Sequence, residues 1–175
     1  MPNDPMELLR DEHDVIRTAQ EVIDGMDRLW TKDEERYEEI FRGLLAFFAG
    51  YSDGFHHRKE ELELFPALKS HPDFYPAGLV DELEEHHRMF RDHVARMQAA
   101  LLERNYEAGQ ARLGRYFDEL LDHMAVENDE LFVMAESLFK EAELERMFFR
   151  FQDIDREQGD KNELEAGMAK LKAML

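Results

Sequence analysis

Apolar residues recur every three or four positions along most of this chain, a spacing that places them on one face of an α-helix. Four long segments show the pattern and are predicted to be helices: residues 5–30, 34–65, 78–104 and 106–139. A shorter fifth helix is predicted around LERMFFRFQDID, and a sixth over residues 161–174. No stretch alternates apolar and polar residues as a β-strand would. The pattern therefore predicts an all-α protein.

The prolines and the connections between these segments indicate how the helices are arranged. Pro5 can open the first helix, since proline is tolerated in a first turn. The stretch PALKSHPDFYPAG, residues 66–78, is the clearest break in the chain. Four long amphipathic helices with short connections predict an antiparallel up-down-up-down four-helix bundle. We expect the bundle to occupy residues 1–139, with a C-terminal helical extension, residues 140–175, packed on or beside it.

Composition narrows the function classes. The 175 residues suffice for one domain with a real core. The 22 basic and 41 acidic side chains give a net charge of −19, which repels phosphate backbones and anionic lipids, so neither nucleic acid nor membrane is an expected partner. The absence of cysteine excludes disulfides and iron–sulfur clusters. No signal peptide or run of ~20 apolar residues is visible, so we expect a cytoplasmic protein.

The histidines take part in an internal repeat. HHRKEELELF (residues 56–65) on the second predicted helix matches HMAVENDELF (123–132) on the fourth. HDVIR (13–17) on the first helix matches HRMFR (87–91) on the third. The two halves of the bundle therefore resemble related helix pairs, each with one lone histidine and one His-x-x-x-Glu.

His-x-x-x-Glu is a spacing that suits metal binding. Residues four apart lie on the same face of a helix, so an imidazole and a carboxylate can bind one ion, or the carboxylate can bridge two. Imidazole and carboxylate without thiolate suit iron, manganese or zinc. The repeat thus predicts a metal site in the bundle core with these ligands: His13, His56, Glu60, His87, His123 and Glu127.

Depth along the helices supports this set in part. At ~1.5 Å per residue, the histidines of the first three helices reach a similar level, whereas His123 fits only if the fourth helix extends past the second.

The repeat favours His56 over His57. His57 and His86 each flank a predicted ligand and could bind metal, orient a ligand or face water. A lone buried histidine is usually a hydrogen-bonded core residue, but buried carboxylates are costly without a cation.

Together the segments DEHDVIR, HHRKEELELFPAL, EEHHRMFR and HMAVENDELF resemble the bacterial hemerythrin-like family, also called the HHE cation-binding domain. FRFQDIDREQG resembles the helical tail of many members. The resemblance implies a four-helix bundle with two non-heme iron ions, bridged by two carboxylates and an oxo or hydroxo oxygen. By this analogy Glu60 and Glu127 bridge, and the terminal ligands are His13, His56, His87 and His123.

One position departs from the family pattern. Oxygen-carrying members have two histidines four residues apart on the third helix, whereas the residue four after His87 is Arg91. A terminal ligand is therefore missing or supplied differently, for example by His57. Open coordination positions would favour exogenous ligands and redox chemistry over reversible oxygen carriage.

The leading hypothesis is a di-iron protein that binds or senses O2 or a related small oxidant, NO included. A di-iron oxidoreductase that decomposes peroxide, or an iron storage, delivery or repair protein, would need the same ligands, so whether the protein is an enzyme stays open. Manganese or a mixed metal pair could occupy the same set. A metal-free interaction bundle is the remaining alternative. A small-molecule ligand (O2, NO or peroxide) and a monomer or homodimer are expected.

Overall fold

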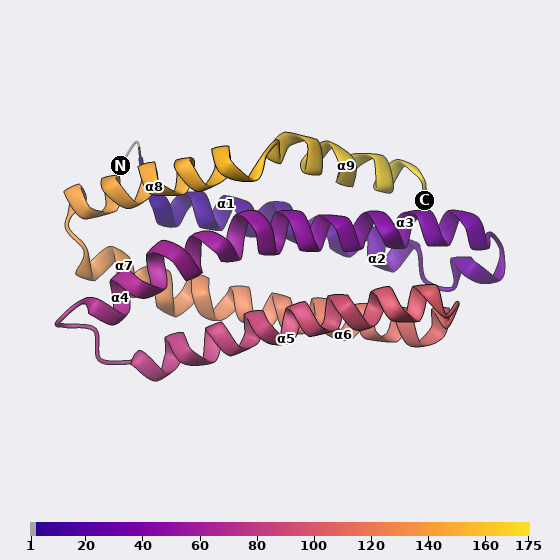
Figure 1. Ribbon diagram of the computed structural model, residues 1–175, viewed down its shortest axis with the longest axis horizontal. Helices are drawn as coiled ribbons and strands as arrows, with labels where there is room; N and C mark the ends of the chain where they lie inside the picture. Colours follow the sequence, from indigo (N-terminus) through magenta and orange to yellow (C-terminus); the bar gives the residue numbers. More distant parts are fainter. Residues whose placement is uncertain (1–2) are drawn as a thin grey trace.

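Residues 3–175 are described by a computed structural model, and in this range they form helices joined by short turns, without a strand. The helices run back and forth along one long axis, as Figure 1 shows, and the predicted all-α helical bundle is confirmed. No helix in the described part of the chain is both long and apolar enough to cross a bilayer.

The first rod of the bundle is made of two helices, α1 (Pro5–Arg17) and α2 (Ala19–Gly25). Asp4 caps α1 by accepting hydrogen bonds from the backbone N–H groups of Met6 and Glu7, and Pro5 occupies the first turn. The predicted unbroken helix over 5–30 is wrong at Thr18, whose hydroxyl bonds the Val15 carbonyl at 2.6 Å and competes with the helix pattern. A 3₁₀ turn, η1 (Leu29–Thr31), follows.

The second rod runs without a break from α3 (Glu34–Phe47) to α4 (Phe65–Ser70). Between them lie two π-helical segments, η2 (Phe48–His57) and η3 (Glu60–Leu64). The predicted break at Pro66 is wrong, because Pro66 lies in the first turn of α4, where the missing N–H is tolerated.

The third rod is the single helix α5 (Ala77–Leu102), and the fourth comprises α6 (Tyr106–Val126), the π-helical segment η4 (Glu127–Leu131) and α7 (Phe132–Leu138). The sequence had suggested that His123 lies at a different level along the bundle from His56. Because the second rod extends to Ser70, this difference disappears. His56 lies 14 residues before Ser70, and His123 lies 15 residues before Leu138. The two His-x-x-x-Glu motifs therefore share one level without any extension of the fourth rod.

The C-terminal residues form α8 (Glu141–Gln158), which is longer than predicted, and α9 (Lys161–Ala173), close to the predicted range. Both helices lie along one side of the bundle in Figure 1, α8 beside α1 and α9 beside α2 and α3. On α9, Leu164 lies against Gly50 and Leu171 against Gly43. The absence of a β-carbon at these two glycines lets α9 approach the second rod closely.

Two apolar clusters fill the interior, and the predicted metal ligands lie in the layer between them. Each rod contributes apolar residues to both clusters. The flanking pairs are Leu9 and Ile16, Tyr51 and Leu64, Leu83 and Phe90, and Leu120 and Leu131. Charged groups in this layer are thus shielded from water and need partners within the protein.

Candidate metal centre

The six predicted ligands converge in the buried layer, one or two from each rod. His13 comes from α1, His87 from α5 and His123 from α6, while Glu60 and Glu127 begin the π-helical segments η3 and η4. All six side chains, including His56 at the end of η2, are at most 1 % exposed. The rods therefore bring together distant parts of the sequence around one enclosed space.

Each carboxylate spans two groups of histidines. Glu60 lies 3.5 Å from His56 Nε2 through Oε1 and 3.4 Å from His87 Nε2 through Oε2. Glu127 lies 3.2 Å from His13 Nε2 through Oε2 and 3.0 Å from His123 Nε2 through Oε1. Each glutamate thus directs one oxygen to each half of the site, the arrangement that two bridged cations would require.

The histidines turn nitrogen lone pairs toward the centre. His56 Nδ1 lies 2.9 Å from Glu12 Oε2, and His87 Nδ1 lies 2.8 Å from Glu61 Oε1. Because a carboxylate only accepts hydrogen bonds, the proton of each neutral ring lies on Nδ1, and the lone pair on Nε2. His13 Nδ1 faces Asn128 Oδ1 at 3.0 Å in the same way.

The Nε2 atoms of neighbouring histidines face one another at short range. Those of His13 and His56 are 2.8 Å apart, and those of His87 and His123 are 3.1 Å apart. In the first pair both nitrogens direct a lone pair inward, and two lone pairs repel at this distance unless a proton or a cation lies between them. The donor set consequently fits a metal ion in each half.

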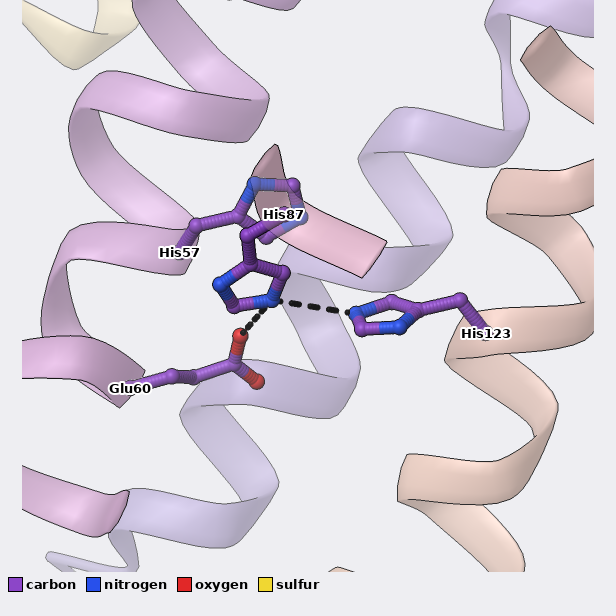
Figure 2. Close-up of side chains that lie close together, drawn as sticks. All are labelled: His57, Glu60, His87 and His123. Carbon is purple, nitrogen blue, oxygen red and sulfur yellow. Dashed lines mark hydrogen bonds and ion pairs between the residues drawn. The ribbon is translucent and has the colours of Figure 1, made fainter. Parts of the chain in front are cut away.

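His57 joins the half that contains His87 and His123. Its ring is 1 % exposed, and neither ring nitrogen has a hydrogen-bond partner. The four side chains in Figure 2 each place a potential ligand atom within 4.8 Å of the others: His57, Glu60, His87 and His123. A second such group consists of His13, His56, Glu60 and Glu127. One half thus has two histidines and the other three.

His86 does not belong to either group. Its side chain is one-third exposed, and its Nδ1 lies 3.3 Å from His123 Nδ1. Of the three roles considered for His86, the geometry fits orientation of a neighbouring ligand.

Glu60 and Glu127 are buried close together, so that without a cation their negative charges are not compensated. Burial, together with the negative charge of Glu127, raises the pKa of Glu60 well above its usual value. Burial also disfavours ionised Glu127, but the adjacent His123 and His13 outweigh this and hold the pKa of Glu127 well below its usual range. The pair therefore retains one proton, which a bound cation would displace.

Comparison with protein families matches residues 4–135 to the hemerythrin HHE cation binding domain. The chain belongs to this family. Neither the search of curated proteins nor the search of solved structures found a match. Cation binding in the bundle core is accordingly the function that the family and the side-chain groups share.

In this hemerythrin-domain protein, π-helical geometry coincides with the ligand-bearing segments. His56 and His57 end η2, Glu60 opens η3 and Glu127 opens η4. A π-helix has more residues per turn than an α-helix, so successive side chains diverge less in direction. This explains why both His56 and His57 turn inward, whereas the repeat had favoured only one of them.

Several functional neighbours of the ligands were missed by reasoning from the sequence. Glu12 and Glu61 bind ligand histidines, and Arg91 Nη2 binds both Glu61 and Asp53, at 2.7 and 2.8 Å. Asp53 in turn lies 3.4 Å from His57 Nδ1. Arg91, which replaces a histidine of the oxygen carriers, thus supports two histidines on the three-histidine side. The chain has 41 acidic residues, and nothing in the repeat distinguishes these three.

Proposed function

We propose that this protein holds two iron ions in the bundle core and uses them to bind or sense O2 or a related small oxidant. The observation that carries the proposal is the pair of glutamates, each with one oxygen toward each group of histidines. His13 and His56 would hold one ion, and His57, His87 and His123 the other. Glu60 and Glu127 would bridge them.

The imbalance between the two halves supports a role in ligand binding. The half with two histidines offers one protein ligand fewer, which leaves room for a small molecule there. Bound iron would supply a pair of redox-active ions that exchange electrons with an oxidant. The protein itself fixes the imidazoles through Glu12, Glu61 and Asn128, and its apolar clusters keep bulk water away from them.

A cavity of about 150 Å³ gives small neutral molecules an approach to this centre. His57 forms part of its wall, together with the apolar residues Phe48, Phe90 and Val94. A second cavity of about 230 Å³ reaches His123 on the other side of Phe90. Both cavities lead to the three-histidine side, so a ligand would enter beside that ion and reach the open position at the two-histidine half from there.

Metal analysis and visible spectroscopy test the proposal. The purified protein is loaded with ferrous iron without oxygen, and its absorption is recorded before and after oxygen is admitted and then removed. Two irons per chain and a band that appears with oxygen and reverses on its removal are expected. If the iron oxidises irreversibly, the protein is instead an oxidoreductase that decomposes peroxide or a protein that stores, delivers or repairs iron. Failure to retain two metal ions would overturn it.

The route through the smaller cavity can be tested separately with Val94→Phe. The larger side chain should fill the cavity and slow the reaction of the reduced protein with oxygen, while leaving two irons bound. Ala99→Phe lies on the same helix but lines a different depression, which does not include any of the ligands, and is the matched control. An unchanged reaction rate in Val94→Phe would show that oxygen enters elsewhere.

The division of the chain into a bundle, residues 1–139, and a C-terminal extension, residues 140–175, remains part of the proposal. The family match ends at residue 135. The extension then serves to cover one side of the bundle next to the site.

A further inference from the structure

A cluster of four charged side chains adjoins the metal centre, and each side chain comes from a different helical part of the chain. Its members are Glu12 on α1, Lys59 between η2 and η3, Asp155 on α8 and Lys161 on α9. Glu12 and Lys59 are at most 1 % exposed. Two positive and two negative charges balance within the cluster, as burial requires.

Glu12 is the link between this cluster and the metal centre. One of its oxygens accepts a hydrogen bond from His56 Nδ1 at 2.9 Å. The other accepts from Lys59 Nζ at 2.6 Å and also from Lys161 Nζ. Lys59 further pairs with Asp155. The charge next to the predicted ligand His56 therefore depends on residues contributed by the C-terminal helices.

The packing of α9 brings Lys161 to this position. Leu164 and Leu171 lie against Gly50 and Gly43, so α9 runs antiparallel to the second rod at close range. Tyr51 donates a hydrogen bond to Glu165 Oε1 at 3.0 Å, and the Lys161 ammonium lies 5.5 Å from the centre of the Tyr51 ring. These contacts hold the start of α9 beside Glu12.

We propose that α9 is part of the metal centre's outer shell: Lys161 balances the charge of Glu12 and thereby sets how strongly His56 donates electrons to its metal. This inference rests on the proposed function, because it assigns a role toward the metal that His56 would bind. An ionised carboxylate on Nδ1–H makes imidazole a stronger electron donor, which stabilises the more oxidised metal. A cation on the same carboxylate weakens that effect.

The two partners should consequently shift the reduction potential of bound iron in opposite directions. Lys161→Met leaves Glu12 with less compensation, so the midpoint potential should become more negative. Glu12→Gln removes the negative charge, so the potential should become more positive. Lys161→Arg restores the cation and should return the potential toward that of the unmodified protein. Damage to packing alone would not produce shifts of opposite sign.

Lys172→Met provides the matched control, because Lys172 lies on the same helix and pairs with Glu21 on the surface, away from the metal centre. All variants are loaded with ferrous iron as the full chain, assayed for iron content and titrated spectroscopically against redox dyes. The control should match the unmodified protein.

The outcomes separate the two proposals. If the unmodified chain retains no iron, the proposed function fails. If it retains two irons but Lys161→Met and Lys172→Met have the same potential, α9 has no part in the outer shell. Shifts of the same sign in Lys161→Met and Glu12→Gln would likewise overturn the inference, since they would reflect disturbed packing.

Discussion

His57 and His86 each stand next to a predicted ligand, yet they differ in direction. The His57 ring is enclosed and forms no hydrogen bond, with Nδ1 3.4 Å from Asp53 Oδ1, whereas His86 is one-third exposed. This contrast arises from local geometry, because His57 belongs to a π-helical segment and His86 to the regular helix α5. Successive side chains diverge less in direction in a π-helix, so His57 is enclosed beside His56, whereas His86 is only partly buried beside His87.

Replacing these two histidines should therefore have unequal effects. His57→Ala removes a donor from the three-histidine half, so one of the two metal ions should be lost under conditions that saturate the unmodified protein. His86→Ala removes only a neighbour of His123, so both ions should stay bound, with an affinity lower by about 10- to 100-fold. Metal titration with analysis of the metal content measures both. Equal losses in the two variants would contradict the assignment of His57 as a ligand.

The buried imidazoles predict how acid affects the metal-free protein. Burial lowers the pKa of His56 to about 3, and it also lowers the pKa values of His57 and His87. The unfolded chain takes up these protons near pH 6.5, but the folded protein does not. The stability due to these groups is thus full above pH 6.5 and falls below it, by up to about 1.4 kcal/mol per pH unit for each group.

Glu60 acts in the opposite sense, because its raised pKa stabilises the protonated folded form as pH falls. Because three imidazoles outweigh this single carboxyl group, the free energy of unfolding decreases as the pH falls. The urea midpoint of the metal-free protein should consequently decrease between pH 7 and pH 5. A midpoint that is constant or increases over this range would contradict the burial of neutral imidazoles.

The side chains that meet in the buried layer were largely predictable from the sequence, but the residues that support them were not. The repeat identified His13, His87 and the two His-x-x-x-Glu motifs because their spacing is periodic along the chain. Glu12 and Glu61 bind histidines on other helices. Such pairs depend on how rods pack, and no local spacing encodes them.

At the scale of elements, the π-helical segments had no visible signal in the sequence. The apolar stripe of residues 34–65 predicted a regular helix, and the structure replaces its ligand-bearing part with η2 and η3. A single extra residue per turn leaves the apolar pattern nearly periodic over a short window. Pro66 likewise suggested an end to the helix, although it can equally occupy a first turn.

The packing of α9 against glycine gives a prediction at the same scale. Gly114→Ala in the open middle of α6 should stabilise the protein by about 0.5–1 kcal/mol through helix propensity. Gly43→Ala gains the same propensity, but its methyl group would collide with Leu171, at a cost of about 1–3 kcal/mol. Of these two variants, only Gly43→Ala should be less stable than the unmodified protein.

Urea denaturation compares the two variants, and Leu171→Ala tests the cause. In the Leu171→Ala background the collision disappears, so Gly43→Ala should no longer destabilise. If Gly43→Ala destabilises equally in both backgrounds, the close approach of α9 is not the reason.

At the scale of the whole molecule, the proposed ligands come from all four rods, so metal binding should stabilise the entire fold. A metal present at a thousand times its dissociation constant adds about 4 kcal/mol per site. In a chain of this length that corresponds to a rise in Tm of roughly 10 °C per saturated site. Calorimetry with and without metal measures the change. Glu60→Ala, which removes a ligand of both halves, should abolish most of it.

The overall architecture followed from the hydrophobic pattern, since four amphipathic segments with short connections have few ways to bury their apolar faces. The position of α8 and α9 did not follow from the sequence. Their apolar faces could have covered another side of the bundle or a second copy of the chain. Gly43 and Gly50 mark the surface on which α9 docks, but only once the neighbouring helix is known.

Because α9 packs antiparallel to the second rod through regularly spaced leucines, an insertion or deletion within α9 should have a specific effect. Leu164 and Leu171 are seven residues apart, as are the glycines that receive them. Lys161 precedes Leu164 by less than one turn, so a single deletion between them would rotate Lys161 by about 100° around the helix. Its ammonium would then point away from Glu12, while the leucines kept their places. Substitutions on the outer face of α9 should be tolerated, whereas an insertion or deletion between residues 161 and 164 should disconnect the helix from the metal centre without unfolding it.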